Sequence, residues 1–253
     1  RSYKKQYAVP RKTLIDNLEE AVVEEKKIEE MDVVFLMDRF GYAKTVDVSV
    51  YERNKEAADT ENRYILTCKN TDKICIFTNK GQMHLLKVLD LPYGKFRDKG
   101  IPIDNLSNYN SSEENFIYII NLGAIIHSRL LFGTKTAMLK MVDGSEFDVA
   151  KRTTASTKLN EDDELLIVHA MTGEETVVMQ SEKEMFLRIE ASTIPEKKKG
   201  AVGVRGMKLN AGDALSNIYV LDGESEQTVE VKGKEVVLNR LRVGNRDTKG
   251  TKR

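Results

Sequence analysis

A repeat of about 50 residues constrains the fold of this 253-residue chain more than any other feature. Leucines downstream of three of its landmarks are spaced by 53 and 50 residues. Self-similarity at such a period is typical of folds built from similar supersecondary units. The landmarks are Lys-Gly pairs at 99–100, 199–200 and 249–250, with Lys151-Arg152 where another pair would fall.

Each unit also contains a predicted β-hairpin. Short runs rich in Val, Ile, Phe and Tyr are broken by Gly, Asn, Asp and Ser, which is typical of strands joined by turns. The turns lie near positions 40, 80, 135, 182 and 232, with spacings of 40, 55, 47 and 50 residues. We therefore expect five units of about four strands each, with hairpins at residues 36–42, 77–83, 132–138, 179–185 and 229–235.

A single four-stranded unit cannot bury both of its faces, so several units must pack against one another. A length of roughly 50 residues per unit favours the blade of a propeller over the coil of a solenoid. An irregular β-sandwich with chance spacing is the alternative. The chain has no Trp, which excludes Trp-Asp repeats and disfavours kelch blades. The predicted fold class is all-β and propeller-like, over residues 31–253.

The N-terminal segment has a different pattern. Leu14, Leu18 and Ile28 fall near helical spacing, and glutamates fill the polar faces of residues 13–30. Thr13 to Asp16 fits a capping box, and Pro10 separates the predicted helix from a basic stretch. We expect residues 1–30 to form a helical connector cut out of a longer arrangement.

Composition favours a folded chain in the cytoplasm. Apolar residues make up 40% of the sequence and charged residues 32%, which supports both a core and a hydrated surface. No apolar run approaches the roughly 18 residues of a membrane span, and the N-terminus lacks the apolar region of a signal peptide. Cys68 and Cys75 lie in apolar runs and predict buried strand residues, and a zinc site would have to recruit distant ligands.

Motifs for catalysis are absent from the sequence. It contains no phosphate-binding loop, His-Glu-x-x-His, nucleophile elbow or calcium loop. The three histidines are more than 40 residues apart and predict surface or hydrogen-bonded strand residues, with His84 the one candidate for a phosphate contact. The acidic run 161–164 could hold a cation, although a solvated turn is favoured. We expect no catalytic residue, no metal and no cofactor.

Basic residues recur at one phase of the repeat, although 40 Lys and Arg balance 40 Asp and Glu overall. Residues 197–208 carry five basic and no acidic side chains, and residues 232–253 carry eight basic against two acidic ones. This asymmetry favours a basic rim that binds a polyanion, and glycines beside the lysines would let backbone N–H groups approach phosphates. The sequence shows neither a recognition helix nor an exposed aromatic series, so the expected ligand is double-stranded DNA of any sequence. The candidate DNA-binding residues are Lys80, Lys87, Arg97, Lys99, Lys135, Lys151, Arg152, Lys197, Lys198, Lys199, Arg205, Lys208, Arg240, Arg242, Arg246 and Lys249.

Three segments resemble the C-terminal β-pinwheel domain found in the A chains of bacterial type IIA topoisomerases, the family of DNA gyrase and topoisomerase IV. They are 77–92 (FTNKGQMHLLKVLDLP), 99–106 (KGIPIDNL) and, most specifically, 200–213 (GAVGVRGMKLNAGD). The resemblance covers nearly the whole chain and is weakest between about 107 and 130. It implies a non-catalytic domain that binds and bends duplex DNA and presents it to the cleavage core of an ATP-dependent enzyme. The implied partners are the ATPase B subunit together with the rest of the A chain, and the implied location is the nucleoid.

One segment departs from that family. Gyrase A chains carry a Gln-Arg-Arg-Gly-Gly-Lys-Gly type of box after the first hairpin, where residues 51–59 here read YERNKEAAD. A degenerate form, RDTKGTK, lies at 246–252. Because the box is associated with closing a chiral wrap, its loss favours weaker wrapping and a topoisomerase IV-like role. A gyrase-like wrapping domain and a protein-interaction propeller are the alternatives, although 7% aromatic residues without Trp offer few anchors for the latter.

Overall fold

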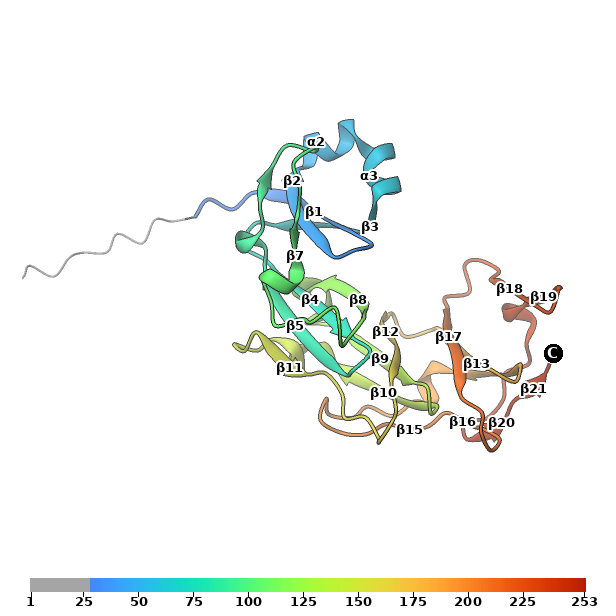
Figure 1. Ribbon diagram of the computed structural model, residues 1–253. Helices are drawn as coiled ribbons and strands as arrows, with labels where there is room; N and C mark the ends of the chain where they lie inside the picture. The colour runs from blue at the N-terminus through green and yellow to red at the C-terminus, as the bar shows by residue number, and fades with distance from the viewer. Residues whose placement is uncertain (1–27) are drawn as a thin grey trace, which may run out of the picture.

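The computed structural model describes residues 28–253 of the chain (Figure 1). The predicted connector helix therefore lies outside the described residues up to position 27. Residues 28–30, which the prediction places in that helix, have no regular secondary structure and lead into the first β-hairpin.

Five antiparallel hairpins lie where the sequence predicts them, which confirms the repeat. The turn between their strands needs a left-handed residue, which is Gly41 (φ 85°) in the first hairpin and Gly81 (φ 71°) in the second. The five hairpins are β1 (Asp32–Asp38) with β2 (Tyr42–Asp47), β4 (Lys73–Thr78) with β5 (Gln82–Lys87), β9 (Arg129–Thr134) with β10 (Met138–Asp143), β13 (Thr176–Ser181) with β14 (Met185–Glu190), and β18 (Thr228–Val231) with β19 (Lys234–Val237).

Each of the first four hairpins gains an inner strand from the residues that follow it, and we call the resulting sheets blades 1 to 4. The inner strands of neighbouring blades contact one another, so they line the inside of the assembly. They are β3 (Asn62–Lys69), β8 (Phe116–Asn121), β12 (Leu165–Met171) and β17 (Leu215–Leu221).

The outer strand of each blade comes from further along the chain, after the next hairpin has formed. Ile101, for example, follows the second hairpin in the sequence and pairs with Ala43 of the first. This exchange ties each blade to the following unit. The outer strands are β7 (Ile101–Pro102), β11 (Thr153–Ala155), β15 (Val204–Arg205) and β21 (Thr251–Lys252).

Three further short strands complete the sheets. β6 (Tyr93–Gly94) adds to β2 in parallel, while β16 (Met207–Lys208) and β20 (Thr248–Lys249) form a parallel pair. The predicted all-β pinwheel class is confirmed. The expectation of four strands per unit needs a correction, because blade 1 has five strands and the described part of the fifth unit is a two-stranded hairpin.

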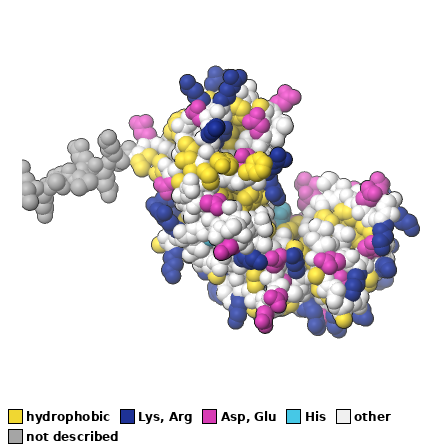
Figure 2. All heavy atoms as spheres, viewed as in Figure 1, with side chains coloured by type: hydrophobic (Ala, Val, Ile, Leu, Met, Phe, Trp, Pro, Cys, Tyr) yellow, Lys and Arg dark blue, Asp and Glu magenta, His cyan; other side chains and the backbone are white. Residues whose placement is uncertain are grey.

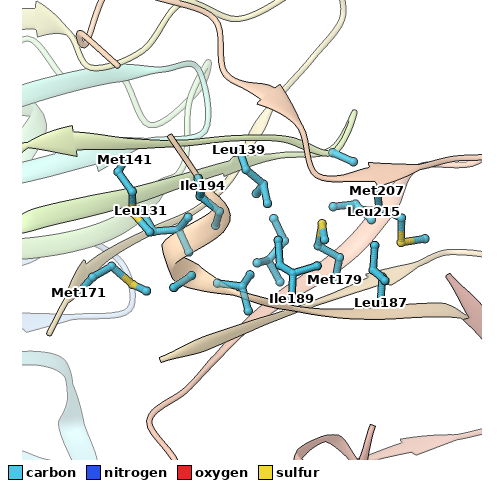
Figure 3. Packing of buried hydrophobic residues seen from close by; sticks show 14 residues of the cluster. Leu131, Leu139, Met141, Met171, Met179, Leu187, Ile189, Ile194, Met207 and Leu215 are labelled. Carbon is cyan, nitrogen blue, oxygen red and sulfur yellow. The ribbon is translucent and has the colours of Figure 1, made fainter. Parts of the chain in front are cut away.

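Packing between blades explains why the hairpin strands are apolar on both faces. Val33 and Phe35 share a core with blade 2, whereas Val34 and Leu36 on the opposite face pack beneath α3 and its neighbours. The same alternation continues along the chain, and Figure 3 shows the cluster between blades 3 and 4. Burial on both faces removes the polar alternation of a half-exposed strand.

Helices cover the free face of blade 1. α2 (Val48–Arg53) begins where Asp47 accepts a hydrogen bond from Ser49 N, and α3 (Lys55–Glu61) buries Ala58 completely. The fifth hairpin covers blade 4 at the other end. The blades thus follow an open arc with both ends covered, not a closed ring (Figure 1).

Short helical turns follow the second strand of the second to fifth hairpins, and they reverse the chain at equivalent places. One more, η2, follows the outer strand β7, and α4 leads from blade 2 into blade 3. These elements are η1 (Val88–Asp90), η2 (Ile103–Asn105), α4 (Leu122–Ile125), η3 (Gly144–Phe147), η4 (Ala191–Thr193) and η5 (Leu238–Arg240).

Candidate nucleic-acid interface

Four loops precede the outer strands and lie at equivalent places on the four blades. We call residues 95–100, 148–152, 197–203 and 244–250 the outer loops. Just before three of these loops the chain pairs in parallel with the second hairpin strand of the blade, at Tyr93–Gly94, Glu196 and Val243. It then bulges outward and returns as the antiparallel outer strand. The outer loops therefore follow the outside of the arc.

Three glycines of these loops have a packing role that the sequence analysis did not predict. A Cβ atom on Gly203 would lie 2.5 Å from Leu139 O, and one on Gly100 would lie 2.8 Å from Ala43 O. Gly250 is equally close to Phe186 O, at 2.9 Å. Glycine at these positions lets the outer strand approach the hairpin backbone. Gly200, by contrast, has no atom within 4 Å of its Cβ position.

The outer loops bring together more than half of the predicted DNA-binding residues. In Figure 2, Lys and Arg side chains gather along the outer margin of the arc, with some acidic groups among them. Lys87 lies beside Arg152 at a groove of about 300 Å³. Arg205 and Lys208 continue from the third outer loop on β15 and β16. The members within the loops are Arg97, Lys99, Lys151, Arg152, Lys197, Lys198, Lys199, Arg246 and Lys249.

Lys80 and Lys135 lie elsewhere, on the hairpin turns of blades 2 and 3. Both form ion pairs with Glu164, at 2.8 Å and 2.5 Å. Hydrogen bonds from Lys135 and Lys80 lower the pKa of Glu164 to about 2. Glu164 thus links two blades, whereas Glu161 and Asp162 form an exposed turn, as the sequence predicts.

Other predicted residues also have acidic neighbours. Arg205 pairs with Asp247, and its hydrogen bond lowers the pKa of Asp247. Arg240 pairs with Glu226 at 3.2 Å. Lys198 lies 3.4 Å from Glu146. Arg242, after η5, is exposed and precedes the fourth outer loop by two residues. The positive surplus is therefore concentrated in the outer loops, above all in 197–199.

His84 is a hydrogen-bonded strand residue, as predicted for the histidines, and it is not available for the phosphate contact considered for it. Its ring is 2% exposed and contacts Glu114 Oε1 at 2.8 Å and Thr153 Oγ1 at 3.1 Å. Cys68 and Cys75 are buried in strands, as predicted, and burial raises the pKa of Cys75 to about 12. Within residues 28–253 no group of three or more His, Cys, Asp or Glu side chains is arranged to hold a metal ion.

Sequence reasoning missed two lysines that lie beneath the basic loops. Lys140 of β10 is 1% exposed, and its Nζ donates to the carbonyl oxygens of Lys198, Lys199 and Ala201. Lys44 of β2 donates in the same way to the carbonyls of Phe96 and Asp98. The available signal was a lysine at the same position of two otherwise apolar hairpin strands.

Comparison with known proteins agrees with this architecture. The model of the DNA gyrase C-terminal domain, a β-propeller, matches residues 128–170 and 175–222. The DNA gyrase A protein of Lawsonia intracellularis is 28% identical over 98% of this chain, and the chain spans 32% of that protein's length. The DNA gyrase A protein of Staphylococcus epidermidis is 29% identical over 92% of this chain, which spans 28% of it. The chain therefore covers about a third of the length of these relatives.

Solved structures share the fold. The C-terminal domain of a DNA topoisomerase IV superposes with a TM-score of 0.78 at 22% identity, covering 88% of this chain and 73% of that one. The C-terminal domain of a DNA gyrase A superposes with a TM-score of 0.58 at 17% identity, covering 87% and 76%.

Blades that exchange their outer strands, follow an arc and carry basic loops along the outer edge define a β-pinwheel domain. Together with the matching gyrase domain model and the gyrase A relatives, this architecture confirms the resemblance to the C-terminal domain of a type IIA topoisomerase A chain. No helix within residues 28–253 combines the length and the hydrophobicity that crossing a bilayer requires.

Proposed function

We propose that this domain binds double-stranded DNA without sequence preference and bends it along the outer edge of the arc. The observation that carries the proposal is the recurrence of basic outer loops at equivalent places on four blades. Lys and Arg side chains that neutralise phosphates release counterions, which supplies affinity for any duplex sequence.

The curvature of the arc supports bending. Outer loops on successive blades point away from the inside of the arc, so a straight duplex contacts few of them at once (Figure 1). Smoothly bending 20 to 30 base pairs costs on the order of 1 to 6 kcal/mol, which contacts to several loops can offset. No base reading is needed for this mode of binding.

The gyrase A relatives suggest the larger setting. In our proposal the domain has no catalytic role or cofactor of its own and presents duplex DNA to the cleavage core of an ATP-dependent type II topoisomerase. Its protein partners are the ATPase B subunit together with the rest of the A chain, in the cytoplasm and at the nucleoid.

A topoisomerase IV-like role is favoured over gyrase-like wrapping. The place of the gyrase box is occupied by α2 and α3, where Ala58 packs against Val34, Leu36 and Val46. A segment held in this way cannot act as a free basic loop, so we expect a short bend instead of a closed wrap. A gyrase A wrapping domain is the alternative within the same family.

Mobility shifts of two unrelated plain duplexes at two salt concentrations test the proposal. We expect equal binding of both sequences, and binding that weakens steeply as salt rises. Reversing the charges of Lys197, Lys198 and Lys199 together will weaken binding while the fold stays intact, because Lys197 and Lys198 are exposed and Lys199, which donates to Glu146 O, is only partly buried. The matched control reverses three exposed cations away from the outer loops, Lys55, Arg63 and Lys234.

Two results would contradict the proposal. One is binding that is absent or insensitive to salt, which would leave the protein-interaction propeller as the better hypothesis. The other is an equal loss of affinity in both triple variants, which would show that net charge matters and the outer loops do not.

A further inference from the structure

Two lysines beneath the basic outer loops bind the loop backbone; Lys140 is buried and Lys44 is half-buried. Lys140 and Lys44 are both the third residue of the second hairpin strand, in blades 3 and 1. Each sends its side chain to the backbone carbonyls of the outer loop of its own blade. The arrangement therefore occurs in two of the four blades, whereas the third residue of the second hairpin strand is His84 in blade 2 and Leu187 in blade 4.

Lys140 shows the arrangement most completely. An ammonium group has three N–H donors and no acceptor. The three acceptors of Lys140 are Lys198 O at 3.3 Å, Lys199 O at 2.8 Å and Ala201 O at 2.8 Å. The group also lies 5.5 Å from the centre of the Phe132 ring. Every donor of this buried cation is therefore satisfied by the loop.

The carbonyl contacts determine where the loop side chains point. With three carbonyl oxygens turned inward to one ammonium, Lys197 and Lys198 remain exposed on the outside of the turn. Lys199 N and Nζ are held by Glu146, whose Oε2 and backbone O accept at 3.0 Å and 2.7 Å. Without Lys140, neighbouring carbonyls in a tight turn repel one another and lose their donor.

We propose that Lys140 is a positioning residue for duplex binding, which fixes the basic loop 197–203 in the conformation that contacts phosphates. Lys44 does the same for the loop 95–100. The inference rests on the proposed function, since it assigns to these two lysines the task of ordering the surface that binds DNA. Neither lysine touches the duplex itself.

Lys140 is a cation although its side chain is buried. Desolvation lowers the pKa of Lys140 to about 8, against a smaller opposing effect of Glu146, so the charged form still predominates at neutral pH. Replacing Lys140 by an apolar side chain of similar length leaves the carbonyl oxygens of the loop without their donor. K140M should therefore release the loop, and any loss of global stability is compared with that of a core variant from the same strand.

Hydrogen exchange measures the loop without DNA. In K140M we expect the amides of Lys199 and Ala201 to exchange at least about tenfold faster, because the hydrogen bonds that order the turn are lost. Exchange in the loop 95–100 should stay unchanged, and K44M should show the reverse pattern. K140R restores the donors and should restore protection. V142A, which removes a fully buried side chain from the same strand, controls for general loss of stability.

Duplex binding completes the test. The slope of log affinity against log salt should become shallower in K140M by about 0.9 for each phosphate contact that the loop loses. Reversing the charges of residues 197–199 should weaken binding less in the K140M background than in wild type, because both changes act through one loop.

The outcomes separate the two claims. A wild-type domain that binds no duplex overturns the proposed function, and with it the role of Lys140 in binding. A wild-type domain that binds, together with a K140M variant that exchanges and binds like wild type, overturns only this inference. Additive effects of K140M and the charge reversal also overturn it.

Discussion

Glu164 provides the sharpest prediction, because its replacement has opposite effects on stability and on DNA binding. The carboxylate accepts hydrogen bonds from Lys80 and Lys135 on two neighbouring blades, and these lower its pKa from 4.5 to about 2. A shift of this size corresponds to a ceiling of roughly 3 kcal/mol. Since the two lysine side chains are 50% and 44% exposed, water screens the pairs, and we expect E164Q to lose about 1–2 kcal/mol at pH 7.

The stabilising contribution of Glu164 depends on pH. A carboxyl group whose pKa is lower in the folded state stabilises the fold above its unfolded pKa, near 4.5, and this contribution disappears as pH falls towards 2. Urea denaturation followed by circular dichroism should show a gap between wild type and E164Q at pH 7 that closes near pH 2. E161Q, at an exposed position of the same turn, is the control. An equal gap at both pH values would refute the electrostatic reasoning.

Duplex binding should change in the other direction. E164Q removes one negative charge and leaves Lys80 and Lys135 without their carboxylate, so affinity for a duplex should rise and its salt slope steepen by up to about 0.9 for each new phosphate contact. Fluorescence anisotropy over a salt series measures both. An affinity that falls in parallel with stability would contradict a role of these two lysines on the binding surface.

Three further changes test the fold that presents the loops. G203A should lose about 1–3 kcal/mol in thermal or urea unfolding, because its Cβ would meet Leu139 O at 2.5 Å, whereas G200A should have little effect; equal effects would contradict the packing role of the glycine. A58E should lose roughly 2 kcal/mol or more by placing a charge beneath α3, while A57E on the exposed side of the helix should not, and a stable A58E would argue against the helical cover. The Cys75 thiol should react with a thiolate-selective reagent only on unfolding, and rapid labelling of the native domain would contradict its burial.

The sequence predicts the hairpins because each is a local feature. Apolar runs flank turn residues such as Asn79 to Gly81, and the paired residues of the two strands are at most 14 positions apart. The outer strands escape prediction since they are two or three residues long and pair far along the chain, as Ile101 does with Ala43. The helices at 48–61 escape as well, because their short segments have no helical period.

The basic rim was partly predictable. Lysine clusters at equal phase indicated the outer loops, but not which charges are paired, since Glu164 lies 84 residues from Lys80. The phosphate contact considered for His84 fails for the same reason, because its partner Glu114 is 30 residues away. Lys140 was overlooked because a lysine in a strand is usually a surface residue, and only the fold shows the carbonyls that satisfy it.

Bending of a duplex is the most direct test of the central claim. Energy transfer between dyes on the two ends of a plain duplex should increase when the wild-type domain binds, equally for two unrelated sequences, and less when residues 197–199 carry reversed charges. Binding that leaves the ends as far apart as in free DNA, or a response confined to one sequence, would contradict a basic outer edge that curves the double helix.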